Sequence, residues 1–274
     1  MARSQSRKLV RPQGHRGSSP RPSARPRIQI CARSSVDRAS HCGCEGRRFK
    51  SSRAYQYQLG KMDIKIIDLT RMLSNGTEGY PGDHVGLTIA QLARVESDGY
   101  NFSSFSHLEA HCGTHIDSPL HFIADGIDIA SLPLQAPLAT VISTTNRQIG
   151  PEAFANAAQL TGRAVLIKTG WDQHIGGDDY YRDAPYLTPA AARLLAESEI
   201  AVLGIDFPSP DPIDSHDYPV HHILLGAGIP IVEGLVGLDQ LAQTGGELLF
   251  VALPLKVAGV EGSPVRAVVI VLNN

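Results

Sequence analysis

One stretch of twelve residues constrains this chain more than any other. Residues 111–122 read H-C-G-T-H-I-D-S-P-L-H-F, which places three histidines and one aspartate within eleven positions. Imidazole and carboxylate groups are ligands for zinc, manganese and related divalent ions. Burying four such side chains without a partner would be costly. The stretch therefore predicts a metal site, and the chain must fold so that these side chains converge.

The spacing within this stretch favours an extended strand. Side chains alternate between the two faces of a strand, so His111, Gly113, His115 and Asp117 would point the same way. A helix would bring the two histidines together but turn the aspartate away around the cylinder. We expect Gly113 to leave room for an ion, because it has no side chain. The following proline ends regular pairing, so a turn can return His121 over the site.

A second pair of candidate ligands lies further along the chain. His221 in P-V-H-H and Glu233 in I-V-E-G are twelve residues apart, the first on an expected short helix and the second ending an apolar strand. The alternative is a solvated histidine and an ordinary surface glutamate. The apolar residues before Glu233 favour a buried carboxylate with a partner. Turn residues rather than ligands are expected in the acidic loop that holds Asp206, Asp211, Asp214 and Asp217.

Residues 111–122 resemble the H-x-G-T-H-x-D-x-P-x-H-F signature of the metal-dependent cyclase superfamily, which includes bacterial kynurenine formamidases and isatin hydrolases. The similarity extends over most of residues 62–274. It includes T-G-W at 169–171, G-I-D at 204–206 and S-P-V-R-A near the end. The resemblance implies a swivelling β/β/α fold and a homodimer or homotetramer.

The resemblance also implies a role for each candidate residue. The signature's first two histidines would bind one ion, its aspartate would bridge two ions, and a histidine and a bridging glutamate would hold the second. The implied metal ligands are His111, His115, Asp117, His221 and Glu233. His222 misses the twelve-residue spacing to Glu233 by one. The last histidine of the signature, His121, would serve as acid and base.

The substrate pocket departs from the family at one position. Family formamidases carry a tryptophan before P-G-D, against the substrate ring, where this chain has Tyr80. We expect the walls of an aromatic-accepting pocket to come from Tyr80, Phe102 and Trp171.

The predicted activity is hydrolysis of a small aromatic amide by metal-activated water, with two zinc or manganese ions. The resemblance implies an N-formyl-kynurenine-type arylformamide as the leading substrate, which would place the enzyme in tryptophan catabolism. A cyclic amide such as isatin is one alternative. A non-catalytic metal- or ligand-binding protein on the same scaffold is another. His121 disfavours that alternative, because a binding protein has no need of a general base.

The order of the expected strands and helices predicts a single α/β domain with a mixed sheet, because they follow one another without strict alternation. No apolar run approaches the ~20 residues that span a bilayer. We expect strands over 64–69, 87–95, 101–110, 138–143, 164–169, 200–205, 229–232, 248–255 and 265–272, and helices over 151–160, 188–199 and 220–226.

The first 61 residues differ from the rest. They hold 15 of the 25 Lys and Arg residues and two acids, giving +13, whereas residues 62–274 carry −15. Their richness in Arg, Ser and Pro predicts a disordered basic extension. The positive charge would suit a nucleic-acid-binding tail, but no aromatic stacking pattern accompanies it in this segment. In a mitochondrial presequence, the prolines would break the amphipathic helix.

Translation upstream of the true start is the interpretation that we favour. Residues 34–39, S-S-V-D-R-A, can be encoded by AGC-TCA-GTT-GAT-AGA-GCN, close to a transfer-RNA D-arm. Residues 48–51, R-F-K-S, can be encoded by AGG-TTC-AAA-TCC, close to a T-arm. Met62 would then be the native initiator of a cyclase-like hydrolase domain, 62–274. Cys112 is its single cysteine, which predicts a cytoplasmic protein without disulfides. We expect a small-molecule substrate and no nucleic-acid or membrane partner.

Overall fold

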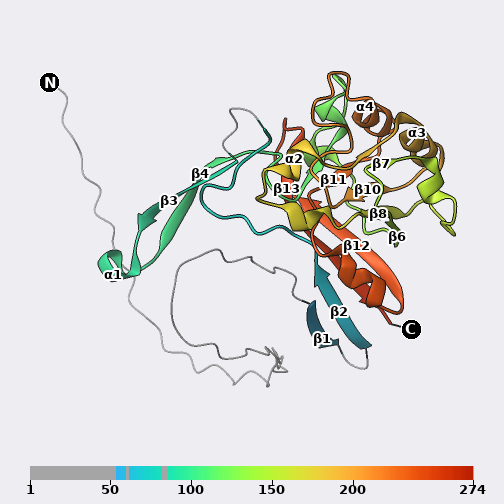
Figure 1. The fold of residues 1–274 in the computed structure, drawn as a ribbon. Coiled ribbons are helices and arrows are strands. Elements are labelled where there is room, and N and C mark those ends of the chain that lie inside the picture. The colour runs from blue at the N-terminus through green and yellow to red at the C-terminus, as the bar shows by residue number, and fades with distance from the viewer. Residues whose placement is uncertain (1–53, 60–61, 82–85, 274) are drawn as a thin grey trace, which may run out of the picture. The chain divides into compact units, whose positions relative to one another are not determined.

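The computed structural model describes residues 54–59, 62–81 and 86–273, and these belong to one compact unit (Figure 1). Among them, nine strands form one mixed sheet. Its order is β1 (Ala54–Leu59), β2 (Met62–Asp68), β13 (Gly262–Leu272), β5 (His115–Asp117), β11 (Ile231–Glu233), β10 (Val202–Ile205), β8 (Ala164–Lys168) and β6 (Ala139–Ser143), with β12 (Glu247–Pro254) paired to β13. The pairs among β6, β8, β10 and β11 are parallel and the others are antiparallel.

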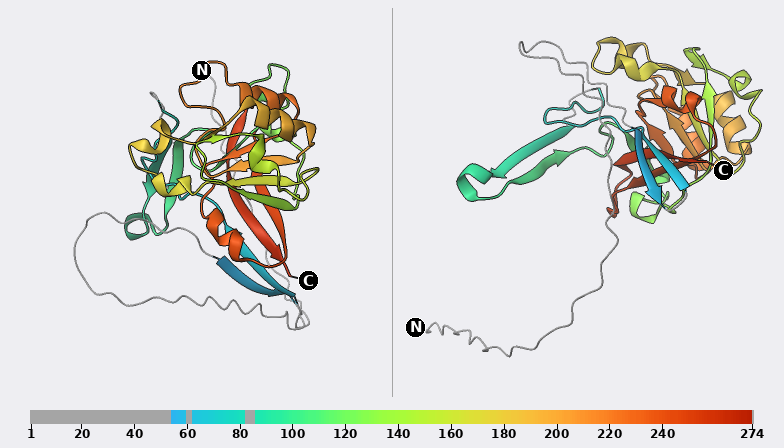
Figure 2. Two further views of the ribbon diagram at one scale, coloured as in Figure 1. Left: turned by 45° about the vertical axis from the view of Figure 1, so that its right-hand side comes forward. Right: turned by 90° about the horizontal axis from the view of Figure 1, so that it is seen from below.

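The sheet curls strongly into a half-barrel. Leu138, just before β6, forms a bridge with Leu249 in β12, and Phe250 N donates a hydrogen bond to Pro137 O over 2.9 Å. β12 therefore approaches the opposite edge of the sheet (Figure 2). The expected α/β fold with a mixed sheet is confirmed.

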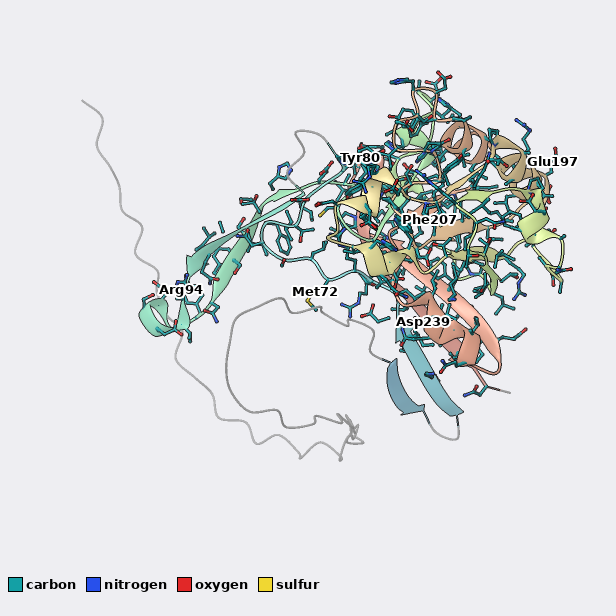
Figure 3. All side chains as sticks on the ribbon, in the orientation of Figure 1. Met72, Tyr80, Arg94, Glu197, Phe207 and Asp239 are labelled. Atoms are coloured by element: carbon teal, nitrogen blue, oxygen red, sulfur yellow. The ribbon has the colours of Figure 1, made fainter. Side chains whose placement is uncertain are left out.

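Two apolar cores cover the two faces of the parallel strands. Val165 and Ile167 of β8 face a cluster that includes α3 (Pro189–Glu197) and α4 (Pro219–Gly226), whereas Leu166 faces the other cluster. This explains why β8 is continuously apolar: both of its faces are buried. Phe207, just beyond β10, is fully buried near the middle of the body (Figure 3). The sequence correctly predicts the buried strand and the Thr188 cap of α3, whose hydroxyl accepts from Ala191 N.

A separate two-stranded hairpin extends from the body (Figures 1 and 2). It pairs β3 (Leu87–Ala93) with β4 (Phe102–Leu108), and α1 (Val95–Asp98) lies at its tip. Most of its side chains are exposed. Several of the exposed ones are large and apolar, namely Leu92, Val95, Tyr100, Phe102 and Phe105.

Short elements complete the fold: η1 (Pro119–His121), η2 (Ile129–Ser131), β7 (Gln148–Ile149) paired with β9 (Tyr186–Leu187), η3 (Pro151–Phe154), η4 (Trp171–His174), α2 (Asp179–Arg182) and η5 (Leu238–Gln243). The helix expected over 151–160 is wrong beyond Phe154. That side chain is buried in the core, and the chain then turns back along β6, where Thr140 Oγ1 donates to Gln159 O.

The segment 1–61, for which composition predicts disorder, includes β1. Its six residues pair with β2, so that expectation does not hold for them. The rest of the expectation concerns residues 1–53 and 60–61, which lie outside the described residues. In the part of the chain that the structure describes, no helix has the length and apolarity to cross a bilayer.

Candidate metal centre

The centre of the sheet carries two acids and a histidine on one face. β5 lies between β13 and β11, and Glu233 stands directly opposite His115. Side chains directly opposite in an antiparallel pair, or two residues apart in one strand, share a face. His115 Nε2 accordingly lies 3.3 Å from Glu233 Oε2 and 3.5 Å from Asp117 Oδ1. All three side chains are buried.

His111 reaches this face from a turn, which corrects the expectation of a continuous strand over residues 111–117. Gly113 has a φ of 69°, in the left-handed region, so the chain turns before β5 begins at His115. Gly113 leaves room for Leu73 rather than for an ion, because a Cβ at this position would collide with that leucine. His111 Nδ1 nevertheless lies 2.9 Å from Asp117 Oδ1.

The first turn of α4 brings His221 to the same acids. Pro219 begins the helix, where its missing N–H is tolerated. His221 Nε2 lies 3.3 Å from Glu233 Oε1 and 3.8 Å from Asp117 Oδ2. The next residue, His222, is exposed, so α4 presents His221 and not His222 to Glu233.

Hydrogen bonds decide which ring nitrogen of two histidines faces the acids. His115 Nδ1 lies 3.0 Å from Gly113 O, and His221 Nδ1 lies 2.7 Å from Asp211 Oδ2. Because a carbonyl or an ionised carboxylate can only accept, each Nδ1 carries the proton. Both Nε2 atoms then point at carboxylate oxygens. Lone pairs that face lone pairs require a proton or a metal cation between them.

Protons can fill this role in the metal-free chain. Burial lowers the pKa of His221, but its hydrogen bond to Asp211 and the nearby Glu233 carboxylate outweigh that effect and raise the pKa to about 10. Burial also opposes charge on His111, yet Asp117 raises its pKa to about 9. Burial raises the pKa of the Asp117 carboxyl, but the neighbouring His111 charge wins and holds it well below its usual range.

The acids retain unused acceptor capacity. From the described residues, both oxygens of Asp117 and Glu233 Oε1 accept no well-directed hydrogen bond, although imidazole nitrogens lie near them. Buried carboxylate oxygens of this kind are costly unless a cation satisfies them. Three groups of ligand atoms each lie within 4.8 Å of one another: His111, His115 and Asp117; Asp117, His121 and His221; and His111, His121 and Glu261. This donor set fits zinc or manganese.

His121 lies over the cluster at the end of η1. Its ring stacks on His111, with centroids 4.3 Å apart, and lies 5.7 Å from the His221 ring. Burial lowers the pKa of His121 to about 4, with help from the His111 and His221 charges and against the Asp117 charge. The imidazole is therefore neutral at neutral pH and can accept a proton.

Tyr80 lies beside Tyr181 of α2, where the hairpin joins the body (Figure 3). Burial raises the pKa of the Tyr80 phenol far above its usual range, and the Glu233 charge adds to that effect. Its ring packs edge-on against Tyr181, with centroids 6.0 Å apart. Trp171 is held against Tyr180, the residue of α2 before Tyr181, because its Nε1 donates to Tyr180 O over 2.8 Å.

Phe102 is not brought to the histidine cluster of its own chain. It pairs with Ala93, at the tip of the hairpin beside Arg94, whereas Tyr80 lies where the hairpin joins the body (Figure 3). Its side chain is 54% exposed. The expected strand over 101–110 exists, but it runs away from the body before it returns to His111, so nearness in sequence does not give nearness in space.

Two acids near the site escape sequence reasoning. Glu261 Oε1 lies 3.3 Å from His111 Nε2, and nothing in its local sequence marks it. Asp211 belongs to the acidic loop from which turn residues are expected. Asp214 and Asp217 of that loop are exposed, as turn residues are, whereas Asp206 and Asp211 are buried and accept hydrogen bonds from other segments.

Known proteins resemble this chain over most of its length. A family model described as "Putative cyclase" matches residues 67–212. A kynurenine formamidase from Salinibacter ruber is 36% identical over 211 residues, which cover 75% of this chain and 97% of that protein. A kynurenine formamidase from Bacillus cereus is 32% identical over 206 residues, covering 74% and 96%.

Solved structures resemble the fold as well. Isatin hydrolase A from Labrenzia aggregata, bound to benzyl benzoate, matches with a TM-score of 0.68 and 26% identity, over 77% of this chain and 94% of that one. A protein described as a "predicted metal-dependent hydrolase" from Bacillus stearothermophilus matches with a TM-score of 0.62 and 26% identity, over 76% and 98%. These relatives are hydrolases, and one is described as metal-dependent.

Proposed function

The chain belongs to the family described as "Putative cyclase", and from this premise we propose that it is a metal-dependent hydrolase of small aromatic amides. The leading substrate is an N-formyl-kynurenine-type arylformamide. Relatives named kynurenine formamidase, at 32–36% identity over nearly their whole length, support this choice. On the same resemblance we assign the sheet to the swivelling β/β/α type.

One observation carries the proposal: two Nε2 atoms and several unsatisfied carboxylate oxygens converge on one buried point, beside a neutral imidazole. His111 and His115 would hold one zinc or manganese ion, and His221 a second, with Asp117 and Glu233 between them. When bound, such ions supply a lowered pKa for water and stabilisation of negative charge on the substrate oxygen.

His121 performs the proton transfers. Its neutral ring accepts a proton from the attacking water and delivers it to the amide nitrogen as the C–N bond breaks. The products are a carboxylic acid and an amine. Stacking on His111 holds the His121 ring in place, so little reorganisation is required between the two transfers.

A cyclic amide of the isatin type is the second candidate substrate. The structural match to isatin hydrolase A favours it, because opening a lactam uses the same proton transfers. Tyr80 and Trp171 would form pocket walls in either case. We also propose a homodimer or homotetramer, because a second copy would cover the exposed apolar side chains of the β3–β4 hairpin.

The test is hydrolysis of formyl-anilines, isatin-type lactams and simple esters by zinc- or manganese-loaded protein. We expect turnover of arylformamides, and His121→Ala should retain its metal while kcat falls by ~10²–10⁴. Asp117→Ala and Glu233→Ala should lose metal. The matched control is His222→Ala, on the exposed side of α4, which should behave as wild type. Metal-free His121→Ala protein beside fully loaded Asp117→Ala and Glu233→Ala would reverse these roles.

A further inference from the structure

Asp211 makes more hydrogen bonds than a turn residue needs. Its side chain is 1% exposed. Oδ1 accepts from Val220 N over 2.9 Å, and Oδ2 accepts from His221 N over 3.0 Å and from His221 Nδ1 over 2.7 Å. One carboxylate therefore bonds two backbone donors of α4 and the ring of its buried histidine.

The helix start depends on this carboxylate. The residue in the N-cap position, Tyr218, makes no side-chain capping bond and has a φ of 40°, which is strained for a non-glycine residue. The free N–H groups of a first helical turn need acceptors. Asp211 supplies them for Val220 and His221, nine and ten residues further along the chain, so it fixes the backbone of α4 and the ring orientation of His221 together.

The same bond selects the tautomer of His221. A carboxylate that accepts from Nδ1 leaves the Nε2 lone pair directed at Asp117 and Glu233. Without it, the proton could move to Nε2 or the ring could rotate about χ2. Either change would remove the nitrogen from the point where the two acids meet.

We propose that Asp211 is the positioning residue of the metal centre, and that it sets metal affinity through His221. This inference rests on the proposed function, because it requires a metal ion at His221. Asp211 itself is not a ligand, since its oxygens are occupied by α4. Partners of this kind typically change metal affinity by ~10–100-fold when removed.

Asp206 offers a matched control five residues away. It is also 1% exposed, and it accepts from Thr169 N, Thr169 Oγ1 and Gly170 N over 2.6–3.0 Å. It therefore has the same burial and the same kind of capping role, but its hydrogen bonds hold the loop after β8. A purely structural effect of losing a buried carboxylate should be common to Asp206→Asn and Asp211→Asn.

The experiment titrates Zn²⁺ into metal-free full-length protein against a chromophoric competing chelator. Melting scans of the same metal-free samples report folding. We expect Asp211→Asn to weaken zinc binding by ~10–100-fold and Asp206→Asn to leave it within about twofold, while both lower Tm. Asp211→Glu keeps the charge but moves the oxygens, and it should give a smaller loss. It also serves if Asp211→Asn fails to fold.

A double-mutant cycle tests whether Asp211 acts through His221. In a His221→Ala background, Asp211→Asn should produce no further loss of zinc affinity. Wild-type affinity in both Asp211 variants would overturn the inference, and so would an equal loss in the two backgrounds or in Asp206→Asn. Wild-type protein that binds no zinc would overturn the metal centre itself, which is a different result.

Discussion

A single methyl group at Gly262 should disable the metal centre. Gly262 begins β13 opposite Asp117, and a Cβ there would lie 2.8 Å from Cε1 and 3.1 Å from Nε2 of His111. Ordinary contact begins near 3.4 Å, so the ring must move by roughly 0.6 Å. It cannot move freely, because His121 stacks on it at 4.3 Å and His115 lies edge-on at 5.0 Å.

The magnitude of this effect follows from the geometry. Overpacking of a filled site costs about 1–3 kcal/mol. For a body of about 210 residues, each kcal/mol lowers Tm by ~2–4 °C, so Gly262→Ala should lower Tm by roughly 2–12 °C. A ligand displaced by several tenths of an ångström is outside the tolerance of a metal site, so zinc affinity should fall by at least ~10-fold.

Zinc titration and melting scans of Gly262→Ala measure both quantities. Gly226→Ala is the matched control, because it lies at the exposed end of α4 and its added Cβ would meet Ile123 Cδ1 at an ordinary 3.7 Å. That variant should bind zinc as wild type does. Unchanged zinc affinity in Gly262→Ala, or an equal loss in Gly226→Ala, would refute the placement of His111 against β13.

Three other predictions concern the site and the N-terminal segment. A chelator should lower Tm of metal-loaded protein by roughly 5–11 °C, because ions at 100 times Kd add about 2.7 kcal/mol; Asp117→Ala protein should show no such shift in the same scan. Tyr80→Trp should change KM for aromatic formamides more than kcat, since it alters ground-state binding, and an unchanged KM for every substrate would exclude Tyr80 from the pocket. Protein begun at Met62 should keep full-length activity, because β2 remains paired with β13 when β1 is lost; a large loss of activity in a steady-state assay would show that residues 1–61 contribute.

The local sequence pattern was sufficient to predict a strand or helix where one short segment contains all the residues that determine it. The apolar run of β8, the capped start of α3 and the P-V-H-H helix are all found close to the predicted positions. Each depends on neighbours within a few residues. The helix expected over 151–160 failed for the opposite reason, since the burial of Phe154 and the return along β6 outweigh local helix preference.

The sequence by itself determined which side chains could form the centre. The spacing of His115 and Asp117 puts both on one face of any strand, and the apolar residues before Glu233 favour burial of that acid. Only the tertiary structure decided how they meet: β5 and β11 lie side by side, so His115 and Glu233 become direct neighbours although 118 residues separate them.

Contacts between segments that are distant in sequence also explain what the sequence left open. Asp211 and Glu261 acquire their partners through the packing of α4 and the pairing of β13, and short local patterns do not encode such contacts. Gly113 was misjudged because a left-handed turn redirects the chain just before β5. The β3–β4 hairpin likewise carries Phe102 away from His111, although the two residues are close in sequence. Residue type and spacing limit the chemistry, whereas sheet order and turn geometry, which arise from contacts distant in sequence, determine where that chemistry is assembled.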